Sequence, residues 1–243
     1  GAIITPAVAV SARDPFNNPV PSFTGNVTVS IGTNPGGGTL AGIATVAAAG
    51  GVATFSNLSI DKSGTGYTLQ ATSGTLTAAT STPFTITPGA ATQLSFSVQP
   101  TNTTAGSSIT PAVQVTARDA QGNTSSGFTG NVTVNIETNP GGGTLAGTRQ
   151  VAAVAGVATF STLSIDKAGT GYTLLAAAVG LVSASSAAFA IAPGPASQFA
   201  FTVPPTNVNA RTAITPAVPG TARDAPGNTA TAFTGTVSVA LGT

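Results

Sequence analysis

Apolar and polar side chains alternate along several short stretches of this chain. Every second residue is apolar from Gln93 to Gln99, and the same alternation runs from Val113 to Ala117 and from Phe128 to Ile136. A period of two residues is that of a β-strand with one face on a hydrophobic core and the other in water. The pattern therefore predicts three half-buried, antiparallel strands in this part of the chain.

A fourth apolar stretch changes phase along its length. Ala158 and Phe160 share one parity, whereas Leu163 and Ile165 share the other. A slip of one residue moves every following side chain to the opposite face of a strand. We therefore expect a bulge or bend at residues 161–162.

The remaining apolar stretches also favour strands. We expect them around Arg149 to Val154, near Tyr172 to Ala176 and from Val182 to Ile191, and no stretch shows a helical period. About seven short strands separated by turns predict an all-β domain, a β-sandwich with Greek-key connections. The uncharged run Leu174–Ala192 could suggest a membrane helix, but the corresponding residues 69–87 are too polar to span a membrane, so we interpret both as strands.

The whole pattern repeats along the chain. The 36 residues from Asn34 to Leu69 recur as Asn139 to Leu174 with 7 differences and no gap, and other motifs recur with the same offset of 105 residues. A period of this length is that of a complete domain rather than of a solenoid repeat. We predict three domains, which are residues 1–87 without a first strand, 88–192 complete, and 193–243 as a first half. We also expect the sequence to be a window on a longer tandem chain.

One predicted turn occurs in all three repeats. It reads Asp-Ala-Gln-Gly-Asn from Asp119 to Asn123, and its equivalents begin at Asp14 and Asp224. The fourth position is Asn17, Gly122 or Gly227. Glycine and asparagine enter the left-handed region of backbone space most cheaply, so we predict a positive φ there. The aspartates are expected to accept hydrogen bonds from nearby backbone amides.

The chain has only two tyrosines, and they are equivalent. Tyr67 and Tyr172 each follow Gly-Thr-Gly and open the penultimate predicted strand. This resembles the tyrosine corner of immunoglobulin-type sandwiches, in which the hydroxyl ties a loop to the next strand. The alternative is an ordinary tyrosine of the hydrophobic core.

The composition excludes several classes of function. With 7 basic and 6 acidic residues the net charge is +1, which argues against binding to nucleic-acid phosphates or to a membrane surface. The chain has no cysteine and no histidine, so it has no thiolate or imidazole chemistry. Without a nucleophile–base pair or paired carboxylates, we expect no enzyme activity.

Candidate binding chemistry is equally sparse. Asp119, Asn123 and Asp166 supply oxygens, but a calcium site needs six to eight of them, so we favour turn capping and predict no cofactor. Gly141–Gly143 is followed by Thr-Leu rather than by the Lys-Ser/Thr of a phosphate loop, which makes it a turn. Lys167 is expected to be solvated, and the phenylalanines are expected to be buried.

Several motifs together resemble a known family. The segments ITPAVQVTARDAQGN, FTGNVTV, NPGGGTL and GVATFSTLSIDKAGTGYTL are similar to bacterial immunoglobulin-like repeats of large cell-surface proteins, of the invasin and intimin type. The resemblance covers the whole chain. It implies tandem immunoglobulin-like sandwiches outside the cell, acting as the stalk or spacer of an adhesin, and it carries over no catalytic residues.

Two other functions stay open at this point. A near-neutral surface gives weak repulsion between molecules, so the chain could instead be a self-assembling subunit of an extracellular filament or sheath. A ligand- or glycan-binding module is the third possibility. The expected partners are the neighbouring repeats of the same chain and, in a fibre, other copies of the chain; no nucleic acid and no membrane span are expected in this segment.

Overall fold

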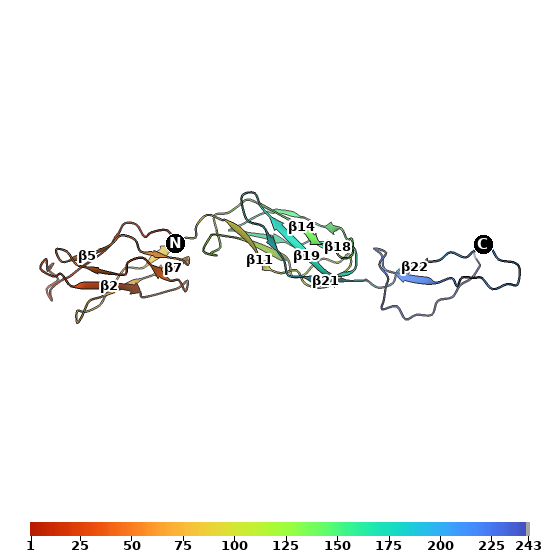
Figure 1. Cartoon of the computed structure of the whole chain (residues 1–243), viewed down its shortest axis with the longest axis horizontal. Helices are drawn as coiled ribbons and strands as arrows, with labels where there is room; N and C mark the ends of the chain where they lie inside the picture. The colour runs from red at the N-terminus through yellow and green to blue at the C-terminus, as the bar shows by residue number, and fades with distance from the viewer. Residues whose placement is uncertain (242–243) are drawn as a thin grey trace. The chain divides into compact units, whose positions relative to one another are not determined.

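A computed structural model describes residues 1–241 of the chain. These residues form 23 β-strands and, within that range, no helix, which confirms the predicted all-β fold. Residues 1–92 and 117–128 form one compact unit, and residues 93–116 together with the chain from 129 onward form a second. Figure 1 draws the strands, coloured from red at the N-terminus to blue at the C-terminus. Nothing in the described part of the chain is a helix long and apolar enough to cross a membrane.

The first unit contains ten short strands. They are β1 (Val8–Ser11), β2 (Asn26–Ile31), β3 (Leu40–Ala41), β4 (Thr45–Ala47), β5 (Val52–Phe55), β6 (Ser59–Ile60), β7 (Gly64–Tyr67), β8 (Leu69–Thr72), β9 (Ala79–Thr80) and β10 (Phe84–Ile86). The main sheet has the order β4-β2-β8-β9, and the pairs β1-β5, β7-β10 and β3-β6 complete the unit.

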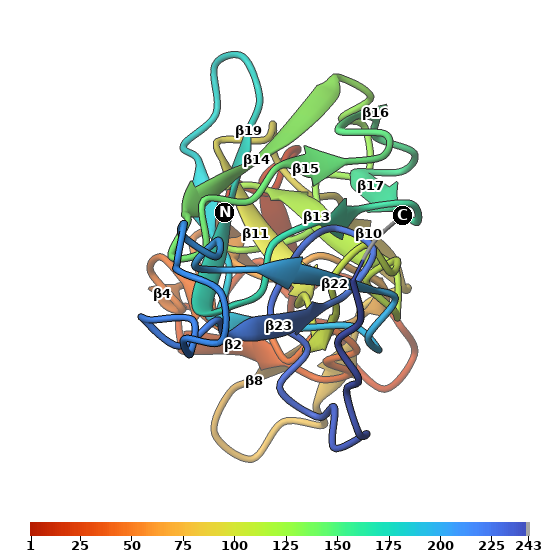
Figure 2. The same ribbon diagram turned by 90° about the vertical axis from the view of Figure 1, so that its right-hand side faces the viewer.

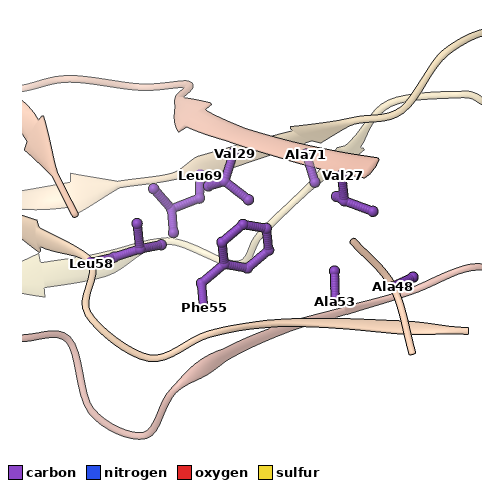
Figure 3. Packing of buried hydrophobic residues seen from close by; sticks show 8 residues of the cluster. All are labelled: Val27, Val29, Ala48, Ala53, Phe55, Leu58, Leu69 and Ala71. Atoms are coloured by element: carbon purple, nitrogen blue, oxygen red, sulfur yellow. The ribbon is translucent and has the colours of Figure 1, made fainter. Parts of the chain in front are cut away.

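The core of the first unit lies between two layers of strands. Phe55, at the end of β5, points toward Val29 of β2 and toward Leu69 and Ala71 of β8 (Figure 3). Its side chain is 1% exposed. Burial of a side chain of this size stabilises the fold by roughly 1.5–3 kcal/mol, so this contact is a main reason why the two layers stay together.

Residues 93–192, which lie within the predicted second domain, contain eleven strands. Its strands are β11 (Gln93–Val98), β12 (Thr103–Thr104), β13 (Val113–Arg118), β14 (Asn131–Thr138), β15 (Leu145–Ala146), β16 (Gln150–Ala152), β17 (Val157–Phe160), β18 (Ser164–Ile165), β19 (Gly169–Ala177), β20 (Ala184–Ser185) and β21 (Phe189–Ala192). One sheet has the order β11-β13-β17 and the other β12-β21-β19-β14-β16, with β20 also paired to β19.

This topology is that of an immunoglobulin-like sandwich. After β11 the chain crosses to the second sheet for β12 and returns for β13. It crosses again between β13 and β14, returns at β17, and crosses once more before β19. β13 pairs antiparallel with β17, and β19 pairs antiparallel with β14 and β21, whereas β12 runs parallel to the last strand, β21. The inward residues of both sheets, such as Val115 and Val134, are fully buried because the alternation seen in the sequence places them on the core face.

Three details differ from or refine the predicted strands. The bend expected at residues 161–162 is confirmed, because β17 pairs with β13 whereas β18 pairs with β15. The segment 182–191 is two strands rather than one, because the Ser186 hydroxyl replaces a backbone carbonyl as acceptor for the Leu174 N–H group at 2.9 Å. The segment between β11 and β13 contains β12, which the sequence pattern did not predict.

Residues 193–241 contain one hairpin-like pair of strands. β22 (Gln198–Phe201) pairs antiparallel with β23 (Gly220–Arg223) (Figure 2). Phe199 and Phe201 are 57% and 61% exposed, and Phe16 is 86% exposed. Phe233 is also exposed, at 38%. The expectation that the phenylalanines are buried is therefore wrong for these four, because Phe16 lies in a turn and no second sheet covers β22 within residues 193–241.

The domain boundaries at residues 87/88 and 192/193 stay a prediction. The two compact units do not follow them, because residues 117–128 of the second repeat group with the first unit. Residues 242 and 243 of the predicted third domain lie outside the described residues. In all three repeats the Thr-Pro peptide bond at the equivalent position is cis, at Pro6, Pro111 and Pro216.

Candidate functional site: a recurrent turn and the loop that binds it

The turn that begins at Asp119 is closed by its own side chains. Oδ1 of Asp119 accepts hydrogen bonds from the backbone N–H groups of Gln121 at 2.9 Å and Asn123 at 2.8 Å. Gly122 has a φ of +78°, and its carbonyl accepts a hydrogen bond from Nη1 of Arg118 at 2.8 Å. The aspartate and the left-handed residue thus hold a tight turn between β13 and β14.

The other two repeats have the same turn. The Asp14 carboxylate accepts from the N–H groups of Phe16 at 3.0 Å and Asn18 at 2.8 Å, and Asn17 has a φ of +68°. The Asp224 carboxylate accepts from the N–H group of Asn228 at 2.7 Å, and Gly227 has a φ of +87°. The structure thus brings each of these predicted aspartates together with the left-handed residue of its own repeat.

In the second and third repeats the second carboxylate oxygen binds the Pro-Gly linker, which lies at the start of the same repeat. Oδ2 of Asp119 accepts the N–H group of Gly89 at 2.8 Å, and Oδ2 of Asp224 accepts that of Gly194 at 2.8 Å. Both aspartates are buried, at 5% and 1% exposure. Each turn is therefore a contact point for the Pro-Gly linker as well as a reversal of the chain.

Burial and hydrogen bonding act in opposite directions on the Asp119 carboxyl. Burial would raise its pKa, but hydrogen bonds from the Asn123 side chain, the Gly89 N–H group and two other backbone amides outweigh it and lower the pKa to about 2. The same balance lowers the pKa of Asp224. Both carboxyls are thus held in the charged form, with amide hydrogens as their partners.

A loop from the preceding repeat binds the outer edge of the turn. Nζ of Lys62 donates to the carbonyl of Gln121 at 2.6 Å, and the N–H group of Ser63 donates to Oδ1 of Asn123 at 3.0 Å. Nδ2 of Asn123 donates in return to the carbonyl of Asp61 at 2.9 Å. We call these three hydrogen bonds the first clasp, and both of its halves lie in the first compact unit.

A second clasp of the same form lies within the second compact unit. Its bonds are Lys167 Nζ to the Pro226 carbonyl at 2.6 Å, Ala168 N–H to Asn228 Oδ1 at 2.9 Å, and Asn228 Nδ2 to the Asp166 carbonyl at 2.9 Å. The expectation that Lys167 is solvated is wrong, because its ammonium group donates to a carbonyl of the next repeat. Two junctions therefore use the same atoms at nearly the same distances.

The two tyrosines fix the loops that carry the clasp lysines. The Tyr67 hydroxyl donates to the Lys62 carbonyl at 2.9 Å, and the Tyr172 hydroxyl donates to the Lys167 carbonyl at 2.9 Å. Both side chains are fully buried, and each ring lies about 6 Å from that of a phenylalanine on the last strand of its repeat. Each tyrosine therefore links the hydrophobic core of a repeat to the loop that binds the next one.

The glycine-rich loop of the second repeat packs against this tyrosine. Burial raises the pKa of the Tyr172 hydroxyl. The backbone N–H groups of Gly143 and Gly141 act in the opposite direction but do not outweigh burial. A Cβ at Gly143 would lie 2.7 Å from Cγ2 of Ile165 and 2.9 Å from the hydroxyl. Glycine is required here because the backbone approaches the tyrosine more closely than a side chain allows.

The loop aspartates hold the clasp loop from its other side. Oδ1 of Asp61 accepts the N–H group of Thr39 at 2.6 Å, and Oδ1 of Asp166 accepts that of Thr144 at 2.6 Å. In residues 1–241 no group of three or more acidic, histidine or cysteine side chains is placed to hold a metal ion. The chemistry that these residues support is hydrogen bonding between successive repeats.

Sequence reasoning missed the clasp. It identified the aspartates, the left-handed positions and the tyrosines, and it expected Asn123 only to cap its own turn and Lys167 only to be solvated; it assigned no role to Lys62. Both recur with the 105-residue offset, Lys62 as Lys167 and Asn123 as Asn18 and Asn228. That recurrence is a usable signal that these residues matter, but it does not reveal that they bind each other.

No protein-family model matches the chain, and no curated protein does. Among solved structures the chain is similar to a beta-glycosidase from Bacteroides vulgatus (12% identity, TM-score 0.37, 70% of this chain and 21% of that one). It is also similar to domains 4-9 of the surface layer protein SbsC (17%, TM-score 0.30, 90% and 31%). A third is invasin, a bacterial integrin-binding protein (16%, TM-score 0.32, 94% and 45%). The chain spans less than half of each, and at these low scores no function is transferred from them.

Proposed function

We propose that the chain is a structural repeat segment of a long extracellular surface protein, in which it serves as the stalk or spacer of an adhesin. The observation that carries this proposal is the repeated clasp. Two successive junctions are joined by the same three hydrogen bonds and by the same linker glycine contact. A chain whose work is to hold successive domains in line needs such contacts, whereas an isolated binding module does not.

The energetics of the clasp support a mechanical role. Each hydrogen bond contributes about 0.5–1.5 kcal/mol net, and bonds to a charged group such as the Lys62 ammonium contribute about 1.5–3 kcal/mol. Since a short, part-proline linker already restricts the chain, three bonds at each junction oppose its bending. The hydrophobic core of each repeat would then supply resistance to unfolding, as in arrays whose stability is roughly additive.

The surface composition supports the role of a passive element. The polar face is built mainly from threonine, serine and asparagine, and charged residues make up 5% of the chain. Such a surface offers no strong electrostatic attraction to nucleic acids or to anionic lipids. The partners that we propose are therefore the neighbouring repeats, through the clasps.

A second candidate function has one observation in its favour. Phe199 and Phe201 of β22, together with Val237 and Val239, line an apolar hollow of about 430 Å³ on the surface of the third repeat. Exposed apolar surface of this kind favours association with another protein. The alternative is that the chain is a self-assembling subunit of an extracellular filament or sheath.

Sedimentation and negative-stain imaging of the chain over a wide concentration range separate the two candidates. A stalk segment is expected to sediment as one species at every concentration. Ordered fibres or sheets would contradict the stalk proposal and favour the filament. Replacement of Phe199 by serine is the matched variant, because it should abolish assembly through the apolar hollow and leave a stalk unchanged. Binding of the unassembled chain to immobilised glycans would favour the ligand-binding alternative instead.

A further inference from the structure

The first repeat carries the same turn without a partner. The two equivalent turns bind a lysine at the carbonyl of their third residue and a loop at the side chain of their fifth. In the first repeat these groups are the Phe16 carbonyl and the Asn18 side chain. Among residues 1–241 no lysine reaches the former and no donor reaches Oδ1 of the latter.

The internal geometry of this turn is nevertheless complete. Asp14 accepts the N–H groups of Phe16 and Asn18 and also the Nδ2 group of Asn18 at 3.1 Å, as Asp119 does with Asn123 at 2.9 Å. Oδ1 of Asn18 is thereby turned away from the aspartate, as Oδ1 of Asn123 is. The turn is thus formed before any partner binds, and its fifth residue, Asn18, is exposed, whereas the equivalent Asn123 and Asn228 are partly buried.

We propose that the turn from Asp14 to Asn18 is a docking surface for the Asp-Lys loop and the Pro-Gly linker of a further immunoglobulin-like repeat that precedes it in a chain. The bonds follow from the two occupied turns. The lysine ammonium donates to the Phe16 carbonyl, the next N–H group donates to Oδ1 of Asn18, and the linker glycine donates to Oδ2 of Asp14. Phe16 fits this role because the acceptor is its carbonyl, and the third position is Gln or Pro in the occupied turns.

Two observations indicate a covalently joined repeat rather than a separate second copy. In both occupied turns the linker glycine lies 30 residues before the aspartate, so it comes from the segment that leads into the same repeat. Both Asp-Lys loops of the chain, at Lys62 and Lys167, are already engaged in its own clasps. A second copy would have to break one of its own clasps to supply the loop.

The test extends the full chain by one period. Residues 106–210 are placed ahead of Gly1, which keeps the register because residue 106 aligns with Gly1 and residue 210 with Ala105. This extension brings the loop of Lys167 and the linker of Gly194 to the turn at Asp14. It contains no copy of residues 13–19, so a peptide covering that turn is unique and its backbone hydrogen exchange can be followed by mass spectrometry.

The expected result is slower exchange of this peptide in the extended chain, to the level of the peptide over residues 118–124 in the original chain. Asn18→Ala is made in both the extended and the original chain. The exchange of this peptide should then be equally fast in the two variants, because the substitution removes the docking contact. Equal exchange with and without the extension would overturn the proposal.

A second arm tests the source of the loop. Exchange of the same peptide is measured in the original chain over a wide concentration range. Protection that grows with concentration would mean that a second copy is the occupant, and it would overturn the assignment to a joined repeat.

The inference rests on the repeat architecture and not on the extracellular role. A failed extension experiment therefore leaves the sedimentation test of the stalk untouched, and fibres in that test leave the docking of the turn untouched.

Discussion

At the scale of single residues, the Asp119 carboxylate joins its own turn to the Pro-Gly linker. Its two oxygens accept hydrogen bonds from the turn and from the linker, and its side chain is 5% exposed. In Asp119→Asn one oxygen becomes an NH₂ group that faces another N–H donor. We expect a loss of about 1–3 kcal/mol in the free energy of unfolding, measured by urea denaturation followed by circular dichroism.

The matched variant for this substitution is Asp14→Asn. Asp14 makes the same turn bonds but is more exposed and has no linker contact. Its substitution should lower the stability by clearly less. Equal losses at Asp14 and Asp119 would contradict the view that burial and the Gly89 bond distinguish the two turns.

The same carboxyl predicts how stability depends on pH. Its pKa of about 2 lies below the value of about 3.9 expected in the unfolded chain. A depressed pKa stabilises the fold above the unfolded pKa, and this contribution is lost as the pH falls through the folded pKa. We therefore expect the urea midpoint to fall between about pH 4 and pH 2, and to fall less steeply in Asp119→Asn. A parallel decline in the two proteins would assign the acid sensitivity to other groups.

The tyrosine hydroxyls are a second residue-scale device. Tyr172→Phe keeps the buried ring but leaves the Lys167 carbonyl without its hydroxyl donor, which should cost about 1–3 kcal/mol of unfolding free energy. Tyr67→Phe should behave alike, since the bond is equivalent. Thr28→Val removes an exposed hydroxyl pair with Thr45 and is the control, with an expected effect near zero. A loss in the control as large as in Tyr172→Phe would refute the role of the buried bond.

At the scale of strands, the sequence pattern predicts the long elements well. The alternation from Phe128 to Ile136 and from Gln93 to Gln99 corresponds to β14 and β11, because half-burial imposes a period of two that six or more residues make visible. Two-residue strands such as β12 and β15 have too few residues for any period. They are set by which neighbour lies beside them, and a single sequence does not contain that information.

The break between β20 and β21 is also set by a neighbouring strand, because Ser186 binds the backbone of β19 there. A substitution at Ser186 tests this. The Ser186 hydroxyl accepts the Leu174 N–H group and donates to the Ala187 carbonyl, and the serine is buried. Ser186→Ala leaves a buried N–H group without an acceptor and should cost about 1–3 kcal/mol. Ser185→Ala, one residue earlier and exposed, is the control for the substitution itself. Similar urea midpoints for both variants would mean that the hydroxyl does not hold the break together.

At the scale of the whole molecule, the sequence shows the repeats but not what joins them. The 105-residue period is plain, and Asp14, Asp119 and Asp224 stand out because a turn that opens with Asp and has Gly or Asn at its fourth position has a local signature. The clasp has no local sequence signature, because Lys62 and Asn123 are 61 residues apart. Each is also a residue type that is common on a solvated surface. Contacts between repeats depend on how two folded surfaces meet, and this is decided only after the local structure has formed.

The clasp itself makes the last prediction, which concerns the junction and not the repeats. Lys62→Ala removes the bond to the Gln121 carbonyl but touches no core residue. Backbone exchange over residues 118–124 should become faster, whereas exchange within β2 and β14, which lie in the cores of their repeats, should not change. Arg149→Ala is the matched control, because it removes an exposed cationic side chain that belongs to neither clasp. If Lys62→Ala left the exchange of the turn unaltered, the lysine bond would be a surface contact that does not stabilise the junction. Faster exchange confined to the turn would instead mean that the junction opens independently of the domains, as a spacer with its own bending stiffness requires.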